Sequence, residues 1–321
     1  MKMKIGFLCV VVMVALVSRM PVKAQPHSLK EFMKPAVKEG GFKMDSFYLW
    51  CPSVIKVGDT YHMFCSRWPA RYGMGGWTKF SECVRATSKN LYGPYTFAEV
   101  VLTKRDGFWD NDRVHNVKIV KSGSTYVLYY ISSKNETGYA YSDKITGPWT
   151  RIDNPAMKVT NPAILVNADK SVYVIGRGEG KDKMNIAIAF TAPVFKGEYK
   201  LLNNGANVLP NDYELEDPTI WWANNQYNML CNDWKAKATG TFKAGAQYFS
   251  KDGVSYTLVS KEPVFTKNVV YDDGTSEVFS RRERPFVFVN ENNEVTAFFS
   301  TCLPQVGSAR IVVQPVDNYV P

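Results

Sequence analysis

The chain has 321 residues and a formal net charge of +9, and 45% of its residues are hydrophobic, which is enough to build a large core. No run of lysine and arginine indicates a nucleic-acid partner. No apolar stretch after the first residues reaches the roughly 18 that a membrane-spanning helix needs. The composition therefore argues against nucleic-acid binding and against a membrane span.

The first 24 residues have the pattern of a secretory signal peptide. Lys2 and Lys4 precede an apolar run over residues 5–17, and small residues end the segment at Ala24. We expect cleavage after Ala24 and a secreted or periplasmic protein. Four basic residues and no acidic residue leave with this segment, which lowers the net charge to +5. A positive balance favours an anionic ligand.

Residues 25–40 are expected to form an N-terminal extension, with a short helix over residues 28–39 that Pro35 weakens. Buried free thiols are expected for the cysteines of the mature chain, because they include no CxxC pair. The alternative is one bridge between Cys65 and Cys83, whose segments could pair as neighbouring strands. The mature chain contains Cys51, Cys65, Cys83, Cys231 and Cys302.

One pattern occurs five times along the rest of the chain. Each copy starts with a polar residue or cysteine, usually followed by proline, and continues with about four apolar residues, a turn and an aromatic-rich strand. Each copy therefore predicts a β-hairpin. The copies start at Cys51, His115, Asn161, Glu216 and Glu283.

A second element follows several of these hairpins and predicts a third strand, a turn and a fourth strand, as in residues 86–95 and 141–149. A unit of four antiparallel strands repeated five times is typical of a β-propeller. We therefore predict an all-β fold, a five-bladed β-propeller with four-stranded antiparallel blades, over residues 41–321. The segment 42–49 should close the ring by pairing with residues 309–316, because closure removes open sheet edges.

In a propeller the first strand of each blade lines the central channel, so the five strand starts should meet at one mouth of that channel. Carboxylates and amides there would bind sugar hydroxyls, and tryptophans would stack on pyranose rings. Two carboxyl groups that flank an anomeric carbon can act as general acid and general base. The five starts are Trp50-Cys51, His115-Asn116, Thr160-Asn161, Glu216-Asp217 and Glu283-Arg284.

These starts, their DP and NP dipeptides and the two S-x-x-x-x-G-P-[YW] repeats resemble the five-bladed β-propeller glycoside hydrolases of families 43 and 117. The resemblance covers residues 41–321. It implies a catalytic propeller domain with a deep pocket for a terminal sugar and three essential acidic groups in the central funnel.

The catalytic residues of these families carry over unevenly. In family 43 an Asp at the start of the first blade is the base, but Cys51 stands in that place, and the nearest replacement is Asp45. Asp217 matches the Asp-Pro of a funnel strand, and Glu283 matches the acid at the head of the last blade. The resemblance to family 117 allows His115 to act as the acid or to hold a central water or cation. The alternative for His115 is a structural role.

The other polar and aromatic residues near the strand starts are expected to bind substrate. Glu216 has an alternative orientation into its blade, since neighbours in a strand face opposite sides. Arg67 would clamp a carboxylate or sulfate of the sugar, or form an ion pair between blades. The expected substrate-binding residues are Trp50, Arg67, Trp68, Asn116, Asn161, Glu216 and Arg284.

We therefore expect a secreted glycoside hydrolase, exo-acting and inverting, that cleaves a terminal sugar from an oligosaccharide or polysaccharide, with an anionic substrate favoured by the charge. No cofactor or metal is required in this view, and a central cation or water in the channel is the alternative. Two other functions stay open. One is a phosphorylase of the family 130 type, and the other is a non-catalytic glycan-binding propeller, which Cys51 in the Asp position would favour.

Overall fold

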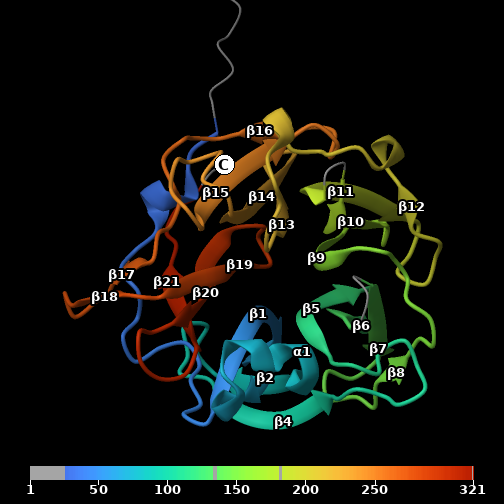
Figure 1. The fold of residues 1–321 in the computed structure, drawn as a ribbon, viewed down its shortest axis with the longest axis horizontal. Helices are drawn as coiled ribbons and strands as arrows, with labels where there is room; N and C mark the ends of the chain where they lie inside the picture. The colour runs from blue at the N-terminus through green and yellow to red at the C-terminus, as the bar shows by residue number, and fades with distance from the viewer. Residues whose placement is uncertain (1–25, 133–135, 181–182, 320) are drawn as a thin grey trace, which may run out of the picture.

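The computed structural model describes residues 26–132, 136–180, 183–319 and 321. They form a five-bladed β-propeller whose blades surround one central axis (Figure 1). The predicted all-β, five-bladed fold is confirmed. The expected signal peptide, residues 1–24, lies outside the described residues.

Four of the blades are four-stranded antiparallel sheets in which strands adjacent in sequence are adjacent in the sheet. In each blade the first two strands form one of the predicted hairpins. Blade 1 holds β1 (Phe47–Val57), β2 (Thr60–Pro69), β3 (Glu82–Ser88) and β4 (Thr96–Leu102). Blade 2 holds β5 (His115–Ser122), β6 (Thr125–Ile131), β7 (Thr137–Ser142) and β8 (Thr150–Arg151). Blade 3 holds β9 (Thr160–Val166), β10 (Val172–Glu179), β11 (Asn185–Ala192) and β12 (Lys200–Leu201). Blade 4 holds β13 (Thr219–Ala223), β14 (Gln226–Asp233), β15 (Ala244–Ser250) and β16 (Thr257–Leu258).

Blade 5 is completed by the N-terminal segment. Its own strands are β19 (Arg281–Val289), β20 (Val295–Leu303) and β21 (Arg310–Pro315). Residues 33–42 run antiparallel to β21, with bridges from Met33 to Val316 and from Phe42 to Ile311. The hairpin of β17 (Asn268–Val270) and β18 (Ser276–Val278) lies beyond them, where the Ala36 N–H donates to the Val270 carbonyl at 2.8 Å.

The predicted partner of the closing segment is correct, but the pairing starts earlier than expected. Phe42 pairs with Ile311, and the Leu49 N–H donates to the Ala309 carbonyl at 3.1 Å. The pairing begins at Met33, inside the range expected to be an extension. The expected helix over residues 28–39 is therefore wrong beyond its first turn, since the backbone from Met33 onward bonds to β21.

Short helical turns occur outside the sheets. Those with described bounds are η1 (Leu29–Phe32), η2 (Ala70–Tyr72), η3 (Met74–Gly76), α1 (Trp77–Phe80), η5 (Asn203–Gly205) and η6 (Pro210–Asp212).

The core lies between the blades. Five clusters of buried hydrophobic side chains each join two neighbouring blades. The cluster at the closure, for example, packs Met63 and Val84 of blade 1 against Phe299 and Val313 of blade 5. The five cysteines of the described residues are buried and free, as expected, and Cys65 and Cys83 lie on adjacent strands without a bond.

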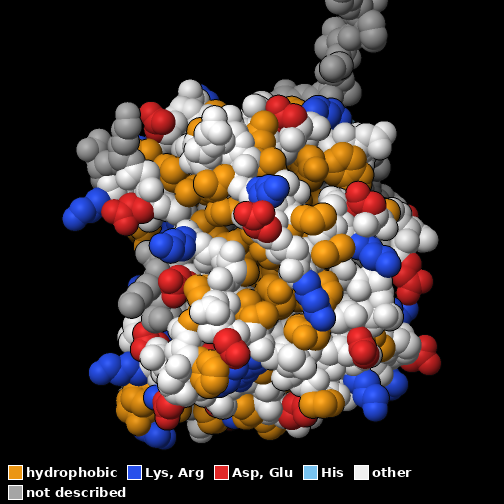
Figure 2. All heavy atoms as spheres, turned by 90° about the vertical axis from the view of Figure 1, so that its right-hand side faces the viewer, with side chains coloured by type: hydrophobic (Ala, Val, Ile, Leu, Met, Phe, Trp, Pro, Cys, Tyr) orange, Lys and Arg blue, Asp and Glu red, His pale blue; other side chains and the backbone are white. Residues whose placement is uncertain are grey.

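The face drawn in Figure 2 is mixed in charge. On the side drawn in Figure 2, acidic and basic side chains are interspersed, and neither sign gathers into one patch. No helix within the described ranges is both long enough and apolar enough to cross a bilayer.

The closure predicts a large effect of one glycine substitution. Gly41 has φ +68°, and a Cβ there would lie 2.0 Å from the Ile311 carbonyl oxygen. Gly58 has a similar φ of +57° but nothing within 4 Å. We expect Gly41→Ala to lower the free energy of unfolding by about 3 kcal/mol and Gly58→Ala by about 1 kcal/mol, because the second change carries the backbone strain alone. Denaturant unfolding would measure both, and equal effects would contradict the described closure.

Candidate active site

The innermost strand of every blade has the same backbone kink in or just before its first half. At equivalent positions one residue adopts the left-handed conformation, which Asn and Asp tolerate best. The kink interrupts the strand ladder, so the register shifts between Trp50 and Ser53 in blade 1 and between Glu283 and Phe286 in blade 5. The kinked residues are Cys51 (φ 59°), Asn116 (54°), Asn161 (51°), Asp217 (54°) and Arg284 (58°).

The kinks sort the strand starts into two layers. All five kinked side chains line a narrow cavity on the axis. The residues just before them line a wider pocket at the mouth of the channel, which we call the funnel pocket. The funnel-pocket layer consists of Trp50, His115, Thr160, Glu216 and Glu283. The five starts therefore converge as predicted: the first residue of each pair lines the funnel pocket, and the second lines the axial cavity.

Hydrogen bonds join the axial layer from blade to blade. The Cys51 thiol donates to Asn116 Oδ1 at 2.8 Å, and Asn116 Nδ2 donates to Asn161 Oδ1. Asn161 Nδ2 in turn donates to Asp217 Oδ1 at 3.1 Å. Arg284 Nη1 pairs with the same Asp217 oxygen at 2.5 Å. Burial raises the pKa of the Cys51 thiol to about 11, so it stays protonated and can donate.

Asp217, expected to be catalytic, lies in the axial layer and not in the funnel pocket. Its side chain is 1% exposed and forms an ion pair with Arg284. Burial raises the pKa of Asp217, and Arg284 opposes that rise. The left-handed backbone turns this carboxylate toward the axis and leaves Glu216 facing the pocket, so the expected position of Asp217 in the pocket is wrong.

The axial cavity does not suit a cation. Its volume is about 10 Å³, which is room for about one water molecule. Lys118 and Arg284 line it beside Asp217, so a cation would face two positive side chains. Two buried atoms, Asp217 Oδ2 and Arg284 Nε, have no hydrogen-bond partner among the described residues. A water in this cavity would donate a hydrogen bond to the first and accept one from the second. The described residues also contain no group of three or more His, Cys, Asp or Glu side chains that could hold a metal.

The funnel pocket has a volume of about 220 Å³. Three tryptophans line it: Trp50 from blade 1, Trp77 from α1 and Trp234 just after β14. Asn116, Asn161 and Arg284 reach both this pocket and the axial cavity, so they form the boundary between them. The pocket thus combines aromatic faces with hydrogen-bonding groups.

Each carboxylate of the funnel pocket is held by a cation. Glu216 pairs with Arg177 and accepts from Asn161 Nδ2 at 2.9 Å. Glu283 accepts from Lys243 Nζ at 3.2 Å and lies 3.4 Å from Arg281 Nη1. The two glutamates come from the adjacent blades 4 and 5. They are the acidic side chains that the described structure places in this pocket.

His115 enters the pocket as a neutral ring with a defined hydrogen-bond role. Ser81 Oγ donates to the Val114 carbonyl at 2.8 Å and lies 2.9 Å from His115 Nδ1. Nδ1 therefore carries the proton and donates to Ser81, which leaves the lone pair on Nε2. Burial, followed by the charges of Arg284 and Arg113, keeps the pKa of His115 well below its usual range.

Three expected site residues lie elsewhere. Asp45 borders a separate surface hollow with residues 304–310. Arg67 pairs at 2.8 Å with Glu82 on the neighbouring strand of its own blade and stacks on Phe47, so the expected ion pair between blades is wrong. Trp68 is fully buried and does not line the pocket.

Trp68 supports the pocket from behind. Its ring centroid is 5.8 Å from that of Trp50 and 5.8 Å from that of His115. Its Nε1 donates to the Gly73 carbonyl at 2.9 Å. The residue therefore fixes two pocket side chains and the insert between β2 and β3.

Several pocket residues were missed at the sequence level. Trp77 comes from the insert between β2 and β3, which has no counterpart in the repeat. Arg113 and Arg281 hold one shared place, three residues before the kinked residue of their blades. This shared place is a signal that an alignment of the five repeats could have found.

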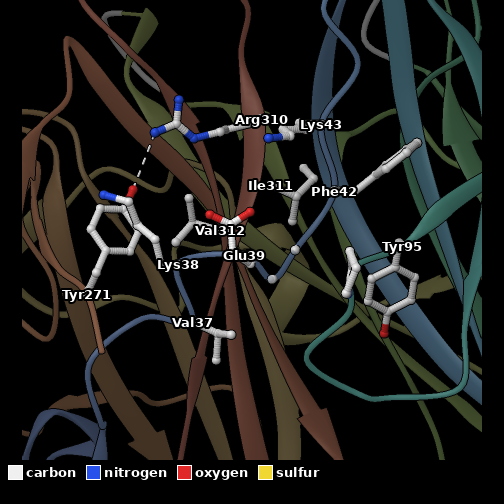
Figure 3. Close-up of a pocket in the computed structure, with 13 residues that line it drawn as sticks. Val37, Lys38, Glu39, Phe42, Lys43, Tyr95, Tyr271, Arg310, Ile311 and Val312 are labelled. Carbon is white, nitrogen blue, oxygen red and sulfur yellow. Dashed lines mark hydrogen bonds between the residues drawn. The ribbon is translucent and has the colours of Figure 1, made fainter. Parts of the chain in front are cut away.

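A larger cavity, of about 560 Å³, lies at the closure of the ring (Figure 3). Two of its polar side chains, Lys38 and Arg310, already have partners. Lys38 Nζ donates to Thr275 Oγ1 at 2.9 Å, and Arg310 bonds to Tyr271 and Glu277. This cavity holds no arrangement of acid and base like that of the funnel pocket.

No protein-family model matches the chain, and no curated protein matches it in sequence. Among solved structures it is similar to an RGII complex of BT0996, with a TM-score of 0.68, 15% identity, and coverage of 91% of this protein and 94% of that one. It is also similar to Zg3597, a family 117 glycoside hydrolase of the marine bacterium Zobellia galactanivorans, with a TM-score of 0.64, 15% identity, and coverage of 90% and 91%.

A third similar structure is the catalytic domain of the GH62 α-L-arabinofuranosidase of Coprinopsis cinerea. Here the TM-score is 0.64 at 12% identity, and the match covers 91% of this protein and 98% of that domain. At these identities the likeness shows a shared fold. The resemblance to propeller glycoside hydrolases is thus confirmed for the architecture.

The buried ion pair on the axis predicts a stability effect. We expect Arg284→Met to lower the free energy of unfolding by about 3 kcal/mol, because it leaves the Asp217 carboxylate buried without its partner. The double variant Asp217→Asn/Arg284→Met should recover most of that loss, since no unpaired charge remains. Denaturant unfolding of both would test this, and a double variant less stable than Arg284→Met would contradict it.

Lys118 predicts a pH dependence. Burial lowers the pKa of its ammonium to about 8, from 10.5. The unfolded chain therefore binds more protons than the folded one between about pH 8 and 10.5, and the contribution of Lys118 to stability rises with pH across that window.

Lys118→Met should therefore be more stable than the wild type at pH 7, by about 2–3 kcal/mol. The gap should close as the pH approaches 10.5. Chemical unfolding at a series of pH values measures the difference, and a gap that does not change with pH would refute the account.

Proposed function

We propose that this protein is an exported glycoside hydrolase that removes a terminal sugar from an oligosaccharide or polysaccharide. One observation carries the proposal. Glu216, Glu283, three tryptophans and a neutral histidine line the same pocket at the mouth of the channel. The likeness in fold to glycoside hydrolases supports it. The pattern of residues 1–24 supports export.

The size of the pocket favours action at a chain end. Pockets for drug-sized ligands usually measure about 300–1,000 Å³. The funnel pocket, at about 220 Å³, is smaller and suits one sugar unit better than an extended chain. Its excess of arginine over glutamate favours a glycan that carries negative charge.

We further propose inversion of the anomeric configuration. Each glutamate is already bound to a cation, which makes it a poorer nucleophile, so direct attack by water is the better path. One carboxyl group would hold that water and the other would protonate the leaving oxygen. His115 Nε2 can accept a hydrogen bond from the water or from a sugar hydroxyl. We propose that the reaction uses no metal and that one water occupies the axial cavity.

Two alternatives have observations of their own. Arg113, Arg177 and Arg281 in the pocket would suit phosphate as the attacking group, as in a phosphorylase. Cys51 in the Asp position and the sealed Asp217 leave two carboxylates in the pocket, which favours a glycan-binding protein without catalysis. Incubation with a panel of plant and algal oligosaccharides, with and without phosphate, separates the three functions. Product formed without phosphate supports hydrolysis, and its anomeric configuration, read by proton NMR, tests inversion.

The proposal predicts that Glu283→Gln and Glu216→Gln each lower the hydrolysis rate by about 10²–10⁴-fold, because each removes an acid–base group. Glycan binding should change much less. Glu99→Gln is the matched control, since Glu99 pairs with Arg85 on blade 1 outside the pocket. Full activity in both pocket variants would rule these glutamates out.

A further inference from the structure

Arg113 differs from the other described cations of the funnel pocket in having no carboxylate within hydrogen-bond distance. Its Nη1 donates to the Thr78 carbonyl at a long 3.4 Å. Its nearest carboxylate is that of Asp112, which is half exposed and 3.9 Å away. Its Nε is buried without a hydrogen-bond partner among the described residues. A guanidinium has five N–H donors, so most of those of Arg113 remain available.

Other basic groups in or beside the pocket have carboxylate partners. Arg177 pairs with Glu216, and Lys243 pairs with Glu283 while its ammonium lies 3.7 Å from the Trp234 ring centroid. Four arginines and two glutamates line the pocket, and the ion pairs of these residues add Lys243, Asp217 and the half-exposed Asp112. Five positive charges therefore face four negative ones, an excess of one. A small pocket with excess positive charge attracts an anion.

Arg113 is also held in place. Its guanidinium lies over the Trp77 ring at 4.9 Å, and the same indole stacks on His115 with ring centroids 4.8 Å apart. A guanidinium fixed in this way loses little conformational freedom when it binds a ligand. Its planar fork of donors matches the oxygens of a carboxylate or a sulfate.

We propose that the sugar held in the funnel pocket carries an anionic substituent, a carboxylate or a sulfate ester, and that Arg113 is its receptor. The inference rests on the proposed function in taking the ligand to be a sugar. Arg113 belongs to blade 2, which is adjacent to neither blade 4 nor blade 5, the blades of Glu216 and Glu283. The anionic group therefore lies away from the bond that is cleaved, which makes Arg113 a determinant of specificity.

The first experiment is a binding screen of the mature protein on an array of plant and algal oligosaccharides, sorted into uronate-containing, sulfated and neutral classes. We expect the bound glycans to fall in one anionic class, and that class identifies the substituent. The best-bound glycan and its neutral counterpart, made by carboxyl reduction or desulfation, are then titrated calorimetrically. Loss of the charge should weaken binding about tenfold or more. Preferential binding of neutral glycans would overturn the proposal.

Variants assign the effect to Arg113. Arg113→Met should weaken binding of the anionic glycan about tenfold and leave the neutral counterpart unchanged, while Arg113→Lys should retain part of the affinity because it keeps the charge. The matched control is Arg71→Met, which removes an arginine stacked on the exposed Tyr72 in the same insert, outside the pocket lining. Equal losses for charged and neutral glycans in Arg113→Met would show a structural role and overturn the assignment.

The proposed function and the anion site can fail separately. Binding of an anionic glycan that depends on Arg113, with no product from any glycan, would refute hydrolysis and support the anion site. Turnover of neutral glycans that needs phosphate and is lost in Arg113→Met would assign this residue to phosphate and overturn the inference.

Discussion

The chain of hydrogen bonds across the axis is the constraint on which the rest of the molecule depends. One side chain from each blade takes part, and the bonds run from Cys51 through Asn116 and Asn161 to the ion pair of Asp217 with Arg284. Each of these side chains reaches the axis because its backbone is left-handed. The same kink turns the preceding residue to the mouth of the channel, so the axial bonds and the funnel pocket arise from one backbone feature.

This coupling explains the unusual charge pattern of the pocket. The axial layer uses Asp217, Cys51 and two asparagines, so the Asp217 carboxylate does not face the pocket. The carboxylates that face the pocket are then those of Glu216 and Glu283, each fixed by a cation. Fixed carboxylates of this kind keep their orientation without help from a ligand.

The architecture could be predicted from the sequence much better than the arrangement of the site. The five hairpins could be predicted because their apolar runs and polar turns are local patterns. The prediction that Asp217 faces the pocket was wrong because the alternation of side chains along a strand holds only for regular backbone. A left-handed residue breaks that alternation, and no repeating pattern of hydrophobic residues reveals it. A hint was present in Asn116 and Asn161, since asparagine tolerates that conformation at matching places in two other repeats. Trp77 could not be predicted, because it belongs to an insert whose position depends on tertiary packing.

The way in which the ring closes affects how the protein is made. Residues 33–42 are synthesised before any blade, yet their partner strand β21 belongs to the last blade, with most of the chain between them. Until that blade is complete, the early segment has no partner and the sheet edge of blade 5 stays open to other chains. A chain that ends before β21 would therefore stay prone to aggregation and proteolysis. Only a chain that includes the last blade can close the ring.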